Sequence, residues 1–138
     1  MTERVEALMA RGDWAGALAE AKKLTESVPT NAKLHGYVGL CLFRMQQFED
    51  ASRSFRTALT LDEKFFDVAL KLAQSLDRLS RYPEALEAAR VAHRLHPSDP
   101  TVNVLIHGLE RQVHEASTDA WQRTAHLSRH QVMLSNED

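Results

Sequence analysis

The sequence is poor in residues that build several common kinds of functional site. Cys41 is the only cysteine among 138 residues, so no disulfide framework can form within the chain. The five glycines are scattered singly, and none of them forms a glycine-rich loop of the kind that cradles phosphates. No stretch is apolar for long enough to cross a bilayer. These absences argue against a disulfide-stapled domain, a nucleotide-binding loop and a transmembrane helix.

An excess of charge of one sign is also missing. Lys and Arg number 17 and Asp and Glu number 19, which gives a formal net charge of −2. A surface so nearly balanced offers no electrostatic reason to bind nucleic acid or an anionic membrane. The first six residues are rich in charge and lack the apolar core of a signal peptide. We therefore expect a cytoplasmic protein with no nucleic-acid or membrane partner.

The chain instead contains a repeat with a period of 34 residues. The residues that recur in phase are Leu8, Leu42 and Leu76, then Trp14, Phe48 and Tyr82, then Ala17, Ala51 and Ala85. A period of about 34 residues is typical of stacked helix–turn–helix units, each of which needs neighbours to cover its apolar face. The period predicts an all-α array.

Helical spacing of apolar residues, with turn signals between them, predicts paired helices. Asn31 should cap the third helix, and Asp62 should help to cap the fifth. The helices expected in order cover residues 2–10, 14–27, 31–45, one that opens at Phe48, one that opens at Phe66, one from Tyr82 to Pro97, and 100–115. Residues 117–119 either cap an eighth helix to about Met133 or lie within a straight continuation. In that segment Trp121, Ala125 and Val132 are candidate inward residues.

These periodic residues resemble the tetratricopeptide repeat family over roughly residues 1–99. The matching positions are Leu8, Gly12, Trp14, Ala17, Ala21 and Pro29; Val38, Gly39, Leu42, Phe48, Ala51, Phe55 and Ala58; and Leu72, Ala73, Leu76, Tyr82, Ala85, Ala89, Ala92 and Pro97. The resemblance implies an α-solenoid with a right-handed superhelix. The expected boundaries are a single domain over 1–134, with repeats at about 1–31, 32–65 and 66–99, a capping helix or helices over 100–134, and a frayed tail over 135–138.

The resemblance also implies a protein-interaction scaffold or adaptor. The concave face of such arrays, lined by the first helix of each unit, usually takes a peptide or a helix of another protein. The partner-binding residues that this implies are Lys33, Tyr37, Leu40, Phe43, Arg44, Asp67, Leu70, Lys71, Gln74 and Arg78. We predict no enzyme, no cofactor and no metal, and we leave self-association open. An alternative is that Tyr37, Leu40 and Phe43 pack against the C-terminal segment and meet no partner.

Two subgroups of the family bear on function. Some members bind the carboxylate tail of heat-shock chaperones through Lys, Asn and Arg, but the matching positions here are Thr2, Glu6, Tyr37, Asp67 and Lys71. Glu6 and Asp67 would repel a carboxylate, so this function is not expected. Bacterial type III secretion chaperones also carry three repeats and a trailing helix. Their similarity to residues 36–42 and to the Phe65-Phe66 pair makes them an alternative.

Seven histidines supply the alternative from another class, an enzyme or a metal-binding protein that uses the C-terminal histidines. His126 and His130 are four residues apart, so a helix would place both rings on one face, a spacing that zinc can use. No glutamate follows His126, which excludes the metalloprotease motif. The sequence nominates no third and fourth ligand, so we predict ordinary surface histidines.

Overall fold

The computed structural model describes the backbone of residues 1–136 and the side chains of residues 1–126. All regular structure in this part of the chain is helical, which confirms the predicted all-α class. The helices are α1 (Glu3–Ala10), α2 (Trp14–Ser27), α3 (Ala32–Arg44), α4 (Phe48–Leu61), α5 (Phe66–Arg78), α6 (Tyr82–Leu95) and α7 (Pro100–Asn136). Residues 137–138 of the predicted tail lie outside the described residues.

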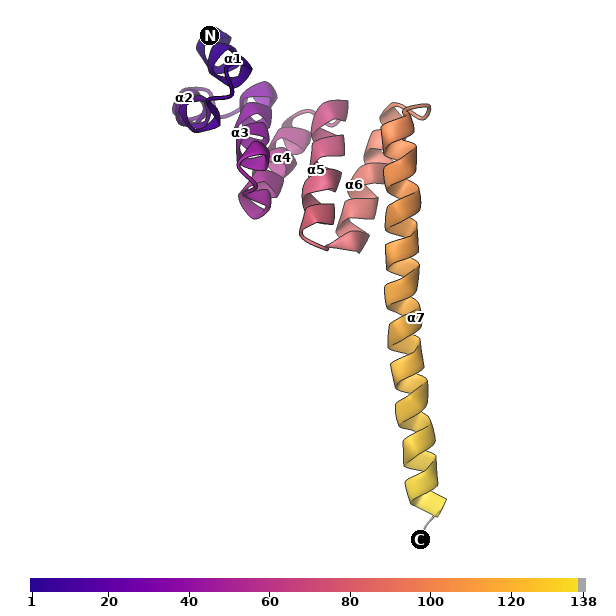
Figure 1. Cartoon of the computed structure of the whole chain (residues 1–138). Coiled ribbons are helices and arrows are strands. Elements are labelled where there is room, and N and C mark those ends of the chain that lie inside the picture. The colour runs from indigo at the N-terminus through magenta and orange to yellow at the C-terminus, as the bar shows by residue number, and fades with distance from the viewer. Residues whose placement is uncertain (137–138) are drawn as a thin grey trace.

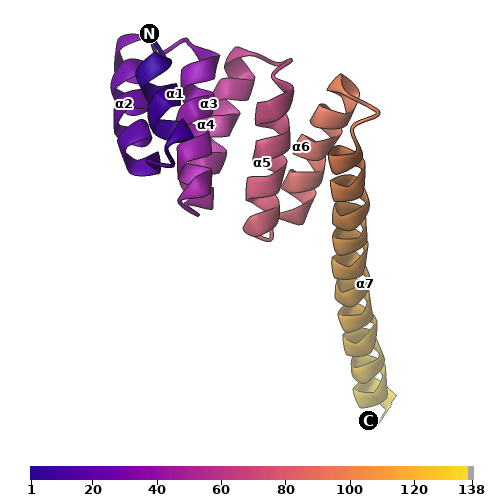
Figure 2. The same ribbon diagram turned by 45° about the horizontal axis from the view of Figure 1, so that its top comes forward.

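The helices are stacked in the order of the chain (Figures 1 and 2). The hairpins α1–α2, α3–α4 and α5–α6 form three successive layers, and every helix packs mainly on its neighbours in sequence. The last helix, α7, packs on α6 and then continues away from the array as a straight rod. Its 37 residues span about 55 Å at the rise of an α-helix. None of the described helices has the length and apolar character needed to cross a membrane.

Small residues allow the helices to approach closely. Ala17, Ala51 and Ala85, one in each second helix, are fully buried. Gly39 on α3 faces the ring of Phe55 on α4, and a Cβ atom at Gly39 would lie 2.6 Å from two ring carbons. Phe55 is itself 1% exposed, so the ring fills the space that the glycine leaves. The repeated small positions are therefore contact points between helices, as the sequence predicts.

The three turns within the hairpins share one backbone geometry. Gly12, Gln46 and Ser80 follow one another at intervals of 34 residues, and their φ angles are 76°, 63° and 59°. After each of them, the next N–H donates back to a carbonyl of the preceding helix, for example Gln47 to Leu42 at 2.9 Å. Only the first turn uses glycine, the residue that adopts this left-handed conformation without steric cost.

We expect Gln46→Gly and Ser80→Gly each to raise the free energy of unfolding by up to about 1 kcal/mol. Glycine removes the left-handed penalty of a side-chain-bearing residue, and its greater entropy in the unfolded chain offsets part of the gain. Urea denaturation measures the change. Gly12→Ala is the matched control and should lower stability by a similar amount. A loss of stability in both glycine variants would contradict the shared turn geometry.

Two capping predictions have different outcomes. The Asn31 side chain accepts a hydrogen bond from the Leu34 N–H at 3.1 Å, which confirms that it caps α3. Asp62 does not cap α5, so that prediction is wrong. Its carboxylate accepts from the Lys64 N–H at 3.1 Å, within the turn, and Phe65 holds the N-cap position without a side-chain bond. Three residues lie between Asp62 and α5, so its carboxylate is too far from the N–H groups of the first helical turn to cap them.

The C-terminal segment is a straight continuation of the seventh helix and not a separate eighth helix, because α7 is continuous through residues 117–119. These residues therefore cap nothing. Trp121 is 71% exposed, so the prediction that it faces inward is wrong, while Ala125 is half-buried. The side chain of Val132 lies outside the described residues. The helix leaves the array before Trp121, and no other element of the described chain covers this ring.

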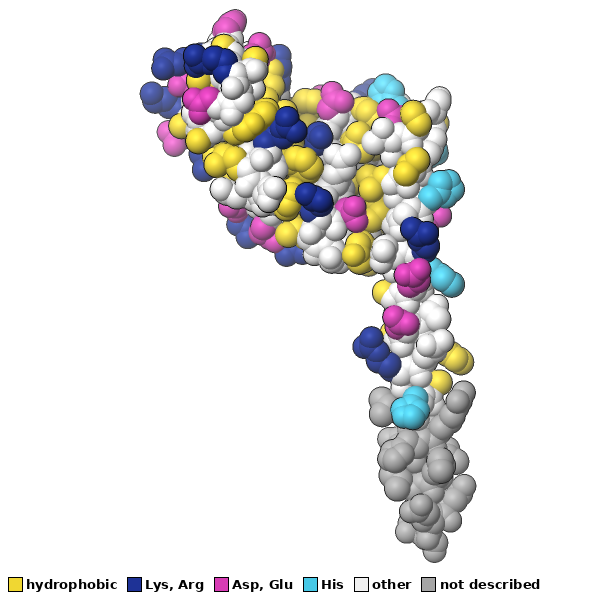
Figure 3. Space-filling view, in the orientation of Figure 1, with side chains coloured by type: hydrophobic (Ala, Val, Ile, Leu, Met, Phe, Trp, Pro, Cys, Tyr) yellow, Lys and Arg dark blue, Asp and Glu magenta, His cyan; other side chains and the backbone are white. Residues whose placement is uncertain are grey.

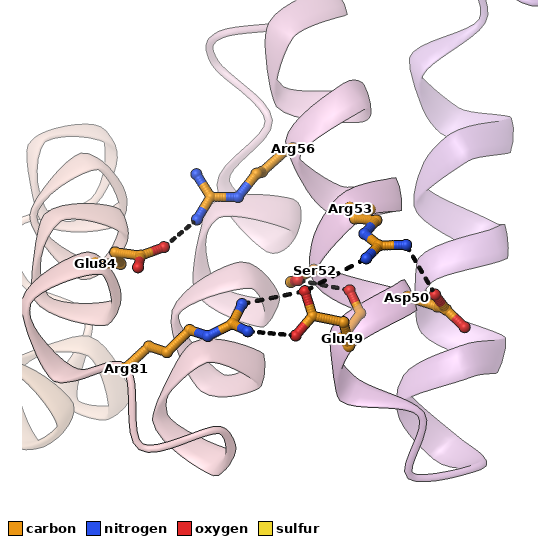
Figure 4. A network of polar contacts seen from close by, with 7 residues as sticks. All are labelled: Glu49, Asp50, Ser52, Arg53, Arg56, Arg81 and Glu84. Atoms are coloured by element: carbon orange, nitrogen blue, oxygen red, sulfur yellow. Dashed lines mark hydrogen bonds and ion pairs between the residues drawn. The ribbon is translucent and has the colours of Figure 1, made fainter.

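Ion pairs join the outer helices of the second and third units (Figure 4). Arg81 contacts the Glu49 carboxylate at 2.6 Å, and Arg56 on α4 contacts Glu84 on α6 at 2.8 Å. The hydrogen bonds from Arg81 lower the pKa of Glu49 below its usual value. All four side chains are solvent-exposed, where such pairs contribute little to stability. We infer that the pairs help to hold the register between units.

Candidate functional site

A pocket of about 690 Å³ opens between α3 and α5, the first helices of the second and third units. Its lining residues are Ala32, Lys33, Gly36, Tyr37, Leu40, Phe55, Asp62, Phe65, Asp67, Val68, Leu70 and Lys71. Six of the ten predicted groove residues are among them: Lys33, Tyr37, Leu40, Asp67, Leu70 and Lys71. Tyr37 and Lys71 therefore face the same hollow, as we predicted.

The helical period places these residues together. Lys33, Tyr37 and Leu40 follow one another at intervals of four and three residues, so they form one stripe along α3. Asp67, Leu70 and Lys71 form the corresponding stripe on α5 at intervals of three and one. Since α3 and α5 are equivalent helices of adjacent units, their stripes face across the pocket. The result is an apolar centre with charged groups at its edges.

Sequence reasoning missed part of the pocket. Phe65 and Val68 approach Gly36 closely, and a Cβ atom at that glycine would lie 3.4 Å from Val68 and 3.6 Å from the Phe65 ring. Phe65 comes directly before α5 and folds back toward α3. The available signal was the Phe65-Phe66 pair, because two adjacent residues at a helix start cannot both point toward the same neighbour. Phe66 instead packs edge-on against His96, with ring centroids 4.2 Å apart.

The N-terminal edge of the pocket is tied to α1. The Tyr37 hydroxyl donates to a Glu6 carboxylate oxygen at 2.6 Å, and the Lys33 ammonium lies 3.5 Å from the same oxygen. Thr2 also donates to it, at 3.0 Å. The bond from Tyr37 is the main reason why the pKa of Glu6 lies below its usual value. Glu6, which matches a position of the carboxylate clamp, is therefore bonded within the protein and also orients the tyrosine.

Lys71 differs from Lys33 because its ammonium has no ion-pair partner among the described residues. Its Nζ lies 4.8 Å from the centre of the Phe43 ring. Burial lowers the pKa of Lys71, and the positive charge of Arg44 lowers it further. The Lys71 ammonium lies over an aromatic ring and has lost part of its hydration. A carboxylate of a bound partner would therefore stabilise its charged form.

The other four predicted groove residues lie outside this pocket. The Arg44 guanidinium is 4.9 Å from the Trp14 ring, and that of Arg78 is 5.2 Å from the Phe48 ring. Phe43 packs edge-on against the same Phe48, with centroids 5.3 Å apart. The two arginine contacts join one unit to the next, whereas the contact of Phe43 with Phe48 lies within the second unit. Gln74 is half-buried, and its side-chain oxygen has no hydrogen-bond partner among the described residues. Their contact with a partner remains a prediction.

The histidines do not form a recognisable metal centre in the described chain. No three His, Cys, Asp or Glu side chains of those residues come together in a way that would hold a metal ion. His107, His114 and His126 are all exposed along α7. The side chain of His130 lies outside the described residues, so the pair that it would form with His126 stays a prediction.

Residues 42–100 match the family model described as "Tetratricopeptide repeat". Over this stretch the chain is similar to tetratricopeptide repeats. This confirms the resemblance that the 34-residue period predicts, and the matched stretch contains all of α4, α5 and α6. No curated protein matches the sequence.

Solved tetratricopeptide repeat structures agree with the fold over most of the chain. The first repeat domain of Spaghetti (RPAP3), bound to an HSP90 peptide, aligns with a TM-score of 0.79 at 16% identity, over 82% of this chain and 90% of that one. The Arabidopsis OM64 domain gives 0.76 at 22% identity, over 80% and 91%. The Sgt2 domain from Aspergillus fumigatus gives 0.76 at 18% identity, over 85% and 79%. Identities this low show a shared fold alone.

Proposed function

We propose that this protein is an interaction scaffold that binds a segment of another protein in the pocket between α3 and α5. The observation that carries the proposal is the pocket itself, about 690 Å³ with Tyr37, Leu40 and Leu70 in its lining. Partly exposed apolar side chains in a concave site are typical anchors for a partner. The Spaghetti domain, which shares the fold, is bound to a peptide, and this supports the same mode of use here.

The lining indicates the chemistry of the segment. One or two apolar side chains would enter between Tyr37 and Leu70, and an acidic group beside them would meet the unpaired Lys71. Asp62 and Asp67 lie at the same pocket, so a basic group suits their side. Such mixed charge does not suit a long anionic polymer. We therefore infer a short protein segment with an apolar anchor and charges of both signs.

The chaperone-tail mode is not proposed. Of the five positions that match the carboxylate clamp, only Lys71 is cationic, and Asp67 lies in the same pocket. Two carboxylates brought together in a partly buried site repel each other. A free C-terminal carboxylate would therefore lose at Asp67 much of what it gains at Lys71.

The secretion-chaperone alternative rests on residues that helix packing explains. Gly39 makes room for Phe55, and Gly36 makes room for Val68 and Phe65. These contacts belong to the stacking of the array and do not indicate a particular cargo. The metal-binding alternative gains no support, since no group of three or more His, Cys, Asp or Glu side chains among the described residues could hold a metal ion. The scaffold is therefore the function that the geometry supports best.

We expect Leu40→Ala and Tyr37→Ala each to weaken binding of the partner segment by about 1–3 kcal/mol, as is usual for interface anchors. The partner is recovered by affinity capture from the native cell, and its binding segment is then titrated calorimetrically against each variant. Loss of the anchor should appear mainly as faster dissociation. Circular dichroism checks that the helices remain.

Two controls separate binding from folding. Tyr37→Phe removes the hydrogen bond to Glu6 but keeps the ring, so it should bind almost as tightly as the parent protein. Leu61→Ala removes an apolar side chain that is 41% exposed at the end of α4 and is not among the pocket lining. If Leu40→Ala and Tyr37→Ala bind like the parent, the pocket is not the binding site.

A further inference from the structure

The rod formed by α7 has a face that no other element of the described chain covers. Val102 and Leu109 on the opposite side are buried against the array. The uncovered side carries exposed residues that alternate at intervals of three and four, and we call them the α7 outer face: Val104, His107, Arg111, His114, Thr118 and Trp121. In Figure 3, histidine side chains gather along the edge of α7 that points away from the array.

The spacing of these residues is that of a seam between paired helices, and Val104 and Trp121 are the large apolar residues in it. Alternation of three and four residues keeps one seam on a single side of a helix over its whole length. Val104 is 73% exposed and Trp121 is 71% exposed, and each stands near one end of the seam. A helix that extends this far without tertiary contacts is marginal in water. The exposed seam therefore has the residue spacing of a pairing surface, and pairing would stabilise the helix.

We propose that the α7 outer face binds the same face of a second copy of this chain, with the two helices antiparallel. The charges decide the direction. Arg111 and Glu115 are exposed, carry opposite signs and lie one helical turn apart. Neither makes an ion pair within the described structure. Within a helix, the order with Arg before Glu is the weaker one, so both groups remain available.

In an antiparallel pair with two-fold symmetry, each of these charges meets an opposite charge of the other copy. Arg111 of each copy then lies opposite Glu115 of the other copy. The same register brings Val104 of one copy next to Trp121 of the other at both ends of the contact. A parallel pair in register would instead place Arg111 against Arg111 and leave Val104 and Trp121 far apart. Like charges directly opposite are unfavourable, so the second copy runs antiparallel.

The arrangement leaves the arrays free to stay folded. The buried face of α7 contacts α6, whereas the seam points elsewhere, so each array lies outside the pair. The contact from Val104 to Trp121 is about 27 Å long at the rise of an α-helix. A seam of this length with only two large apolar anchors per copy is small for a protein interface, so the dimer depends on concentration.

Sedimentation equilibrium of the full chain tests the pairing, with protein concentration varied from about 5 to about 500 µM because association follows mass action. The mass should rise from 15.6 kDa toward twice that value. Trp121→Ala should shift the midpoint to a concentration higher by about tenfold or more. Gln112→Ala, an exposed residue of α7 away from the seam, is the matched control and should leave the midpoint unchanged. A parent protein that stays at 15.6 kDa throughout overturns the proposal.

Charge-swap variants test whether Arg111 and Glu115 face one another across the contact. Arg111→Glu and Glu115→Arg should each weaken self-association by about tenfold or more, because each puts like charges opposite one another. Mixed in equal amounts, the two variants should form a heterodimer, in which every facing pair has opposite signs. The repulsion within each helix is unchanged by mixing, so recovery reports the contact between copies. If the mixture associates no better than its components, these charges do not face one another across the contact. If Arg111→Glu alone associates as tightly as the parent, the pair is not antiparallel.

Discussion

Phe55→Ala is expected to lower the free energy of unfolding by about 3–5 kcal/mol, the usual cost of deleting a large aromatic side chain from a core. Phe55 is 1% exposed and occupies the space beside Gly39, at the contact of α3 with α4. That contact belongs to the middle unit of the array, so both neighbouring units depend on it. Urea denaturation followed by circular dichroism measures the loss.

A second substitution shows whether the ring and the glycine share one space. In the parent protein, Gly39→Ala would place a methyl group 2.6 Å from the ring, which should cost about 1–3 kcal/mol through overpacking. In the Phe55→Ala background, this cost should largely disappear because the ring is gone. Gly108→Ala, at a helical glycine with no neighbouring atom within 4 Å, is the control and should add about 1 kcal/mol of stability. An equal cost of Gly39→Ala in both backgrounds would contradict the close approach.

Leu42→Ala should lower the free energy of unfolding by about 2–5 kcal/mol, since it leaves a cavity that the surrounding helices cannot fully close. Leu42 is 4% exposed, whereas its equivalent in the first unit, Leu8, is only half-buried. Leu8→Ala should therefore cost less than Leu42→Ala. Leu61→Ala, at a side chain 41% exposed, should cost least of the three. Equal losses in all three variants would contradict the dependence of the loss on burial.

The fold was predictable because its signal is repeated. Ala17, Ala51 and Ala85 occupy one phase of a 34-residue period, and all three are buried contact points. The turns were harder, since Gln46 and Ser80 adopt the left-handed geometry without being glycine. In these turns, stacking of the units overrides local preference. The course of α7 was also undecided, because residues 117–119 resemble a cap although the helix runs through them.

The candidate site was predictable only in outline. Helical phase placed Lys33, Tyr37 and Leu40 on one face, but phase alone does not say which residues a neighbouring element covers. Arg44 is an example, because its guanidinium stacks on Trp14 of the preceding unit, outside the pocket. Phe65 is the opposite case, a residue outside any helix that folds into the pocket. Both depend on contacts between units, which the spacing within one helix does not contain.

Because each layer touches only the next, the array can open locally from its N-terminal end. In such a chain of neighbours, the terminal unit has one interface where inner units have two, so its amides should exchange with solvent first. The shortest helix, α1, carries Glu6, which holds the Tyr37 hydroxyl and the Lys33 ammonium. When α1 detaches, both groups are released at the edge of the pocket. Fraying of eight residues thus changes the polarity of the site without unfolding the helices that form it.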